Sequence, residues 1–99
     1  MVELTTGPYC DAVRERSPEA PRLLEILRAA AAEAHRLGLE VHAGHGMDYE
    51  TAKPIAAIPE LMELNIGHFL IGEAIFVGLT PAIQRMRALM DEARAERAA

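Results

Sequence analysis

Two histidines in this sequence stand beside glycines, at points where a run of alternating apolar residues breaks off. Gly44-His45-Gly46 follows one run, and Gly67-His68 follows another. Histidine titrates near neutral pH and can transfer protons. Glycines allow the backbone unusual dihedrals and a close approach to a ligand, and a helix that follows offers free N–H groups to an anion. We therefore expect His45 to act as an acid or base beside a phosphate site, with His68 converging on the same ligand.

The elements that must position these residues alternate between strand and helix patterns. Strands are predicted over 2–6 and 39–44, and a third strand ends at Gly67, because apolar and polar residues alternate there. A loop is expected over 9–16. Helical spacing, proline near the start and glycine at the end predict helices, which cover 17–37, 49–58, 69–77 and 80 to about 94.

The region after Leu64 allows two interpretations. Residues 64–72 could form one long strand, or the strand could end at Gly67 and a short helix follow. The apolar spacing from Phe69 to Val77 suits a helix better than a strand. We therefore expect a short extra helix after the third strand.

This order predicts an α/β fold with right-handed crossovers and a parallel sheet, in a single domain over 1–99. Each strand has one apolar face and one face with polar residues. The polar set is Glu3, Thr5, Glu40, His42, Glu63 and Asn65. A doubly wound sheet would bury both faces, so a polar face suits the lumen of a TIM (β/α)8 barrel. Three parallel β/α units make only part of such a barrel, which needs about 250 residues.

The composition argues against several classes of function. The net charge is −5 with no basic stripe, so no nucleic-acid partner is expected. No apolar run reaches about 20 residues, so we expect no membrane span. A single cysteine, Cys10, and the lack of a leader pattern favour a reducing, cytoplasmic location.

Other chemistry-bearing residues have simpler interpretations. No third ligand stands at a recognisable spacing from His45 and His68, so no metal is expected. Cys10 lacks a visible base partner and should be inert. For Glu3 the default role is a structural salt bridge, and for His42 a structural hydrogen bond is as plausible as a functional role.

Five motifs together are similar to the carboxyl-terminal part of the pyridoxine 5′-phosphate synthase family. They span residues 3–9, 42–46, 57–61, 63–68 and 71–79, in the family's order. The resemblance implies a TIM-barrel enzyme of vitamin B6 biosynthesis that forms homo-oligomers. It implies condensation of 1-deoxy-D-xylulose 5-phosphate with 3-amino-2-oxopropyl phosphate to pyridoxine 5′-phosphate, phosphate and water, with neither metal nor organic cofactor.

The resemblance also implies roles for individual residues. His45 matches the family's proton-donating histidine, and Glu3 matches an acid that stabilises a transition state. Gly46, Gly67 and His68 match positions that bind the aminoketone phosphate. Two positions depart from the family pattern, since His42 stands where asparagine is usual and Thr5 where histidine is frequent.

The resemblance covers the sixth to eighth units of the barrel only. The family's catalytic glutamate base and a second catalytic histidine belong to its first five units, so the 99-residue chain should be inactive alone and should associate. The alternative is a non-catalytic barrel fragment that binds phosphate or drives oligomerisation.

Overall fold

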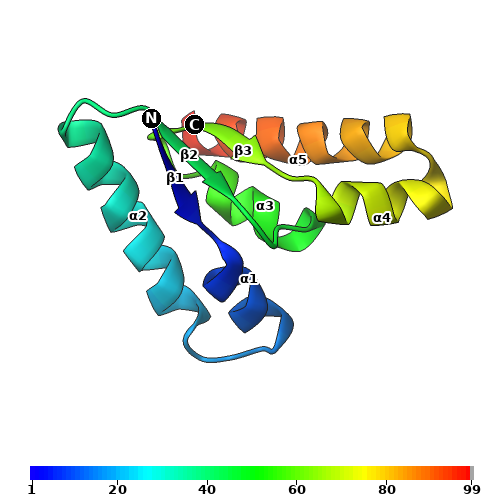
Figure 1. Ribbon diagram of the computed structural model, residues 1–99, viewed down its shortest axis with the longest axis horizontal. Helices are drawn as coiled ribbons and strands as arrows, with labels where there is room; N and C mark the ends of the chain where they lie inside the picture. The colour runs from blue at the N-terminus through cyan, green and yellow to red at the C-terminus, as the bar shows by residue number, and fades with distance from the viewer. Residues whose placement is uncertain (99) are drawn as a thin grey trace.

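The computed structural model describes residues 1–98 and contains one parallel sheet of three strands. The strands are β1 (Val2–Thr5), β2 (Val41–Gly44) and β3 (Leu61–Asn65), in the order β1-β2-β3. Each strand leads into a helix, so neighbouring strands are joined by crossover connections (Figure 1). The predicted α/β architecture of three parallel units, with an extra helix after the last strand, is confirmed.

The helices of the described chain are α1 (Gly7–Arg14), α2 (Ala20–Arg36), α3 (Tyr49–Ala56), α4 (His68–Val77) and α5 (Leu79–Ala98). The prediction of a loop over 9–16 is wrong, because α1 occupies most of it. Pro8 lies in the first turn of α1, where its fixed φ favours a helix. Burial of Tyr9, Cys10 and Ala12 stabilises this short helix. Thr6 and Pro8 are helix-start signals, but the Thr6 side chain does not cap α1.

Several predicted boundaries shift by a few residues. The second helix starts at Ala20 rather than residue 17, and the second strand starts at Val41 rather than residue 39. The predicted helix stop at Gly38 is confirmed, since this residue has a φ of 82° and follows the end of α2. Leu39 still donates its N–H to the Ala34 carbonyl, which holds the chain in the helix-ending turn before the strand begins.

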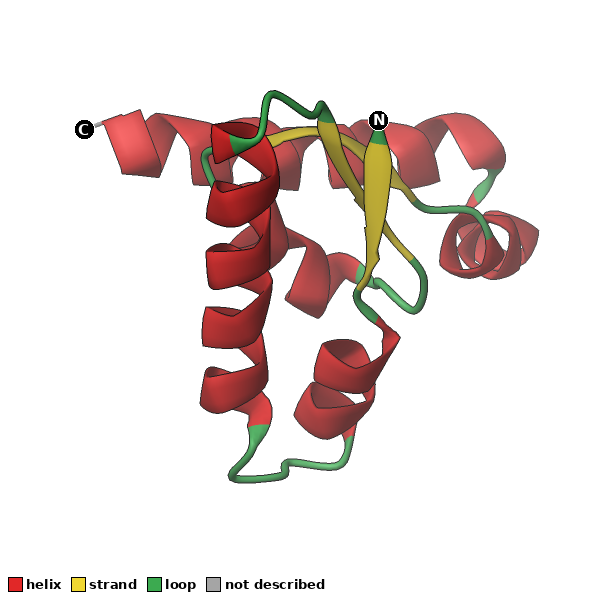
Figure 2. Cartoon of the chain, turned by 60° about the vertical axis from the view of Figure 1, so that its left-hand side comes forward, coloured by secondary structure: helices red, strands yellow, loops and turns green. Residues whose placement is uncertain are grey.

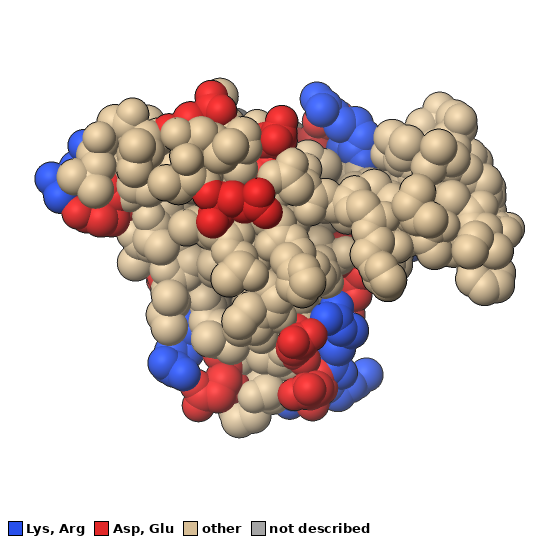
Figure 3. Space-filling model, in the orientation of Figure 1, with Lys and Arg blue, Asp and Glu red and all other residues tan. Residues whose placement is uncertain are grey.

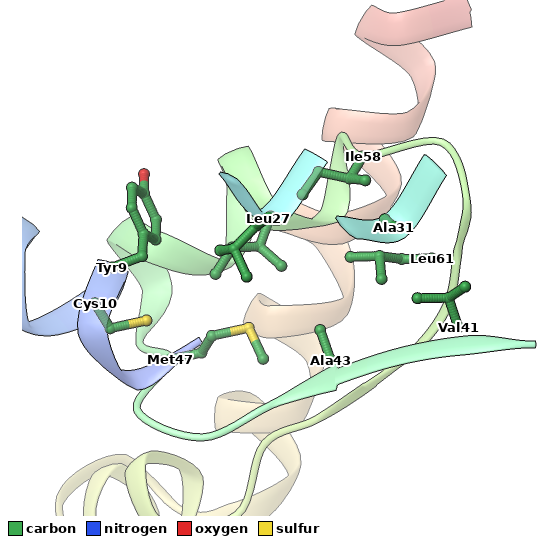
Figure 4. Close-up of a cluster of buried hydrophobic side chains, with 10 residues drawn as sticks. Tyr9, Cys10, Leu27, Ala31, Val41, Ala43, Met47, Ile58 and Leu61 are labelled. Carbon is green, nitrogen blue, oxygen red and sulfur yellow. The ribbon is translucent and has the colours of Figure 1, made fainter. Parts of the chain in front are cut away.

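The sheet has one covered face and one open face. Helices α2, α3 and α5 lie on the same side of the strands (Figure 2). Val41 and Ala43 of β2 point into this layer, where they meet Leu27 and Ala31 of α2 (Figure 4). Burial of these apolar side chains supplies the main driving force for packing the sheet against the helices.

The opposite face carries polar residues, as predicted. Glu3 and Thr5 of β1 and Glu63 and Asn65 of β3 are exposed there. In a closed barrel this face would line the lumen.

One extra residue interrupts the pairing of β3 with β2. Val41 pairs with Leu61, but His42 pairs with Glu63, so Met62 has no partner in the register. This is a β-bulge, in which two residues of one strand oppose one residue of the other. It places Leu61 on the covered face and Glu63 on the open face, although residues two apart in a regular strand would share a face.

Candidate functional site

A hollow of about 670 Å³ opens at the carboxyl ends of the three strands. Its lining includes all five residues that the sequence singled out, namely Glu3, His45, Gly46, Gly67 and His68. They come from β1, from the loops after β2 and β3, and from the first residue of α4. The structure therefore brings together residues that lie up to 65 positions apart in the chain.

The loop after β2 holds His45 in a backbone conformation that L-residues rarely adopt. Its φ is 89°, and that of Gly46 is 82°. For a non-glycine residue such a dihedral costs about 1–3 kcal/mol and is concentrated at functional sites. The imidazole ring lies against Gly7, where an added Cβ would come within 2.8 Å of His45 Cδ2. Gly7 thus leaves the space that the His45 ring occupies.

The loop after β3 ends in a helix start that is open to a ligand. Gly67 is the N-cap of α4, and no side chain of the described residues caps this end. A Cβ added at Gly67 would have nothing within 4 Å. The start of α4 and the positive end of its dipole therefore lie at the hollow with no side-chain cap among the described residues, which suits an anion site.

A second helix start at the hollow is already occupied. Asp48, which the sequence predicts as the cap of α3, accepts a 2.9 Å hydrogen bond from the Thr51 N–H. In return, the Asp48 N–H donates to Thr51 Oγ1 at 2.9 Å. This capping box fills the start of α3 with a carboxylate. Of these two helix starts, α4 is the one that remains available to a phosphate.

An aromatic contact fixes the start of α4 against its neighbours. Phe69 packs edge-on against Tyr49, with ring centroids 4.7 Å apart and planes at 82°. The Arg85 guanidinium lies 4.2 Å from the centroid of the Tyr49 ring. Tyr49 also donates its hydroxyl to the Ala82 carbonyl at 3.3 Å. These contacts tie α4 to both α3 and α5.

His42 lies on the open face of the sheet but not in the lining of the hollow. Its side chain is 11% exposed and has carboxylates at both ring nitrogens. Nε2 lies 2.7 Å from Glu40 and Nδ1 lies 3.2 Å from Glu63. This pairing favours the structural interpretation of His42. Among the described residues, no group of three or more His, Cys, Asp or Glu side chains could hold a metal ion.

Cys10 of α1 is fully buried near Met47, in the loop after β2 (Figure 4). Burial raises the pKa of its thiol, which outweighs hydrogen bonds with Thr51 and Thr6 that lower it. A thiol that stays protonated at neutral pH is a poor nucleophile. The structure therefore gives Cys10 a packing role.

Sequence reasoning missed two residues that shape the site. Arg14 lines the hollow and donates to the Gly46 carbonyl at 2.8 Å. Thr6 is fully buried and bonds to the loop that carries His45. The contacts of these two residues could be inferred only if α1 were recognised as a helix, since α1 brings Arg14 back to the loop after β2.

The fold defines a class of protein: a parallel β/α chain that has an uncapped helix start and two histidines at the carboxyl ends of its strands. Comparison with known proteins agrees. Residues 1–92 match the family described as "Pyridoxal phosphate biosynthesis protein PdxJ". The chain belongs to this family.

Relatives named "Pyridoxine 5′-phosphate synthase" are highly similar to the chain. A relative from Caulobacter vibrioides is 67% identical over 97% of this chain and 38% of its own length. Those from Ruegeria pomeroyi and Xanthobacter autotrophicus are 66% and 62% identical, over 96% of this chain and 39% and 37% of their own lengths. The chain thus spans about two fifths of the relatives that it matches. No helix among residues 1–98 is long and apolar enough to cross a membrane.

Proposed function

We propose that this chain supplies the sixth to eighth β/α units of a pyridoxine 5′-phosphate synthase. The reaction condenses 1-deoxy-D-xylulose 5-phosphate with 3-amino-2-oxopropyl phosphate, giving pyridoxine 5′-phosphate, phosphate and water. One observation carries the proposal. Glu3, His45, Gly46, Gly67 and His68 line a single hollow that contains the uncapped start of α4.

In this proposal the phosphate of the aminoketone binds at the start of α4. The N–H groups that follow Gly67 bind its oxygens, and His68 and Gly46 contact it from two sides of the hollow. His45 donates a proton to the reacting intermediate during ring formation. Glu3 stabilises positive charge that develops in the transition state.

Turnover requires groups from the first five units of the barrel, including the catalytic base. Strands β1 and β3 are the outer strands of the described sheet, so their free edges are where further barrel strands would pair. We also propose a cytoplasmic location and a homo-oligomeric state for the assembled enzyme.

A second candidate function is oligomerisation without catalysis. Helix α4 has no buried residue, and its Ile71, Ile75 and Phe76 are exposed. The end of the molecule formed by α4 and the start of α5 shows almost no charge in Figure 3. An apolar surface of this kind favours association with another protein surface.

Reconstitution tests the main proposal. The 99-residue chain is mixed with a polypeptide that carries the part of the Caulobacter vibrioides relative preceding the matched segment. Formation of pyridoxine 5′-phosphate from the two substrates is measured by chromatography. We expect product from the mixture, none from either polypeptide alone, and none with His45→Gln. A folded complex that forms no product would contradict the proposal.

A binding experiment separates the two candidates. Dihydroxyacetone phosphate, which replaces the amine of the aminoketone phosphate by a hydroxyl, is titrated into the full chain in a calorimeter. The enzyme proposal and the phosphate-binding alternative both predict binding, whereas pure oligomerisation predicts none.

A further inference from the structure

Donors from the segment after β1 hold three consecutive carbonyl oxygens of the turn at residues 44–46, which we call the His45 turn. The Thr6 N–H donates to the Gly44 carbonyl at 2.9 Å. The Thr6 hydroxyl lies 3.0 Å from the same oxygen and 2.6 Å from the His45 carbonyl. Arg14 Nη1 donates to the Gly46 carbonyl at 2.8 Å. Every peptide oxygen of the turn therefore has a donor.

The His45 turn needs this support because its backbone is unfavourable. His45 and Gly46 both have positive φ values, 89° and 82°. Glycine adopts such a φ readily, but a histidine pays for the contact of its Cβ with the backbone. A strained residue of this kind persists only where the surrounding structure holds it. Without its hydrogen bonds, the His45 peptide would relax to negative φ and carry the imidazole away from Gly7.

The hydroxyl of Thr6 is directed to this turn instead of to its own helix. Thr6 is the N-cap of α1, a position where threonine usually accepts a hydrogen bond from the helix backbone. Here no such cap forms. The single hydroxyl proton is shared between the two turn carbonyls, and the shorter contact is to His45. Because Thr6 is fully buried, water cannot replace it as the donor.

The guanidinium of Arg14 is likewise committed to the protein. One nitrogen donates to Gly46, and the other pairs with Asp11 at 2.6 Å. Asp48 adds a longer ion pair of 3.8 Å. Arg14 is the one arginine or lysine among the described residues that line the hollow. Its donors nevertheless point to the turn and to two carboxylates, which orients the side chain for support of the backbone.

We propose that Thr6 and Arg14 are positioning residues that fix the proton-donating histidine through the carbonyls of its own turn. Helix α1 joins the two residues and so links the end of β1 to the His45 turn. This inference rests on the proposed function for the role of His45, but the conformation of the turn can be tested without activity.

The first test measures that conformation by nuclear magnetic resonance on the isotopically labelled full chain. A residue with positive φ has a short distance between its amide proton and Hα, so His45 should give a strong intraresidue NOE. We expect Thr6→Val and Arg14→Met to weaken this NOE and shift the His45 and Gly46 amides, and Thr6→Ser to restore both. Thr80→Val and Arg22→Met are the matched controls for the threonine and the arginine variant. Arg22→Met removes an i,i+3 ion pair like that of Arg14.

The second test uses the reconstituted mixture, with turnover normalised to folded chain. Misplacement of an acid by about 1 Å can lower turnover about a hundredfold. We expect kcat to fall at least about tenfold in Thr6→Val, with an altered pH profile, an almost unchanged KM for the aminoketone phosphate, and recovery in Thr6→Ser.

The two tests separate this inference from the proposed function. The positioning role of Thr6 and Arg14 would be overturned, whatever the activity, by unchanged His45 and Gly46 signals in both variants. A negative φ at His45 in the unaltered chain would overturn it as well. The variants could instead displace the His45 turn while the mixture with the unaltered chain forms no product. That result would support the positioning role of Thr6 and Arg14 and reject the proposed function.

Discussion

The Asn65 amide donates a 3.3 Å hydrogen bond to the Glu3 carboxylate, and the two side chains meet over Gly44 of the strand between them. A Cβ at Gly44 would collide with Glu3 Oε1 and lie 3.1 Å from the Asn65 Cβ. The glycine therefore permits the outer strands of the sheet to make contact on the open face. This contact fixes the carboxylate that we propose as a transition-state stabiliser.

Replacement of Gly44 by alanine should break this contact. The Asn65 carbonyl, 3.2 Å from the added Cβ, belongs to the backbone and cannot move aside freely. We expect the free energy of unfolding to fall by about 1–3 kcal/mol, as for other overpacked sites, and product formation in the reconstituted mixture to fall with it. Urea unfolding gives the first quantity. Gly72→Ala is the control, because its Cβ meets nothing within 4 Å and alanine should stabilise α4 by about 0.5–1 kcal/mol.

Substitution of Gly67 tests the phosphate site with little effect on the fold. A valine side chain at this position would extend into the open space at the start of α4. We expect the affinity for dihydroxyacetone phosphate to fall at least about tenfold, while the free energy of unfolding changes by no more than about 1 kcal/mol. Calorimetry and urea unfolding measure the two. Gly72→Val places the same side chain on the same helix outside the hollow, so equal losses of affinity in both variants would contradict the site.

Alkaline pH should destabilise the chain through Cys10. Burial raises the pKa of this thiol above its ordinary value of 9.0, so the unfolded chain releases the proton first as the pH rises. The contribution of Cys10 to the free energy of unfolding should therefore be constant below about pH 8.5 and fall above it, with a slope approaching about 1.4 kcal/mol per pH unit. Burial also raises the pKa of Tyr9, so this residue lowers the free energy of unfolding further from about pH 10.

Urea unfolding at pH 7 to 10 checks this prediction against Cys10→Ala. The alanine variant is expected to show a flatter dependence between pH 8.5 and 10, whatever its stability at pH 7. Parallel curves for the two proteins would contradict the prediction, because the thiol would then have the same pKa in the folded and the unfolded chain.

The exposed apolar face of α4 should drive self-association. Ile75 and Phe76 are 79% and 85% exposed. We expect the unaltered chain to sediment as an oligomer, and the pair Ile75→Ser and Phe76→Ser to shift it toward monomer. Ile26→Ser on α2 is the control, since it removes an exposed apolar side chain elsewhere. A monomer at every concentration of the unaltered chain would refute the expectation.

Local patterns in the sequence were sufficient for the order of strands and helices apart from α1. Period-two alternation located β1 and β2, and the glycines beside His45 and His68 marked the strand ends where the hollow opens. Helix α1 was missed because it has only eight residues and because Gly7-Pro8 after a strand is also typical of a loop. With α1 missed, the supporting roles of Thr6 and Arg14 could not be inferred.

Two further features depend on contacts that no local pattern encodes. The positive φ of His45 reflects donors 31 to 39 positions away, and the contact of Glu3 with Asn65 joins residues 62 positions apart. Glycine at 44 and 46 permits both arrangements but does not specify them. The roles of Glu3, His45, Gly46, Gly67 and His68 in catalysis and binding stay predictions until the experiments above are done.

The extra residue at Met62 is a point where β3 can change length without changing the site. The side chain of Met62 is 71% exposed, so most replacements there should be tolerated. Its deletion would convert the bulge into regular pairing and leave the faces of the residues on either side unchanged. Leu61 would then directly precede Glu63, and Glu63, Leu64 and Asn65 would keep His42, Ala43 and Gly44 as their partners in β2. In a library of variants of this protein, position 62 should therefore accept nearly every substitution and its own deletion, whereas deletion of the paired Leu64 would turn Asn65 toward the buried layer.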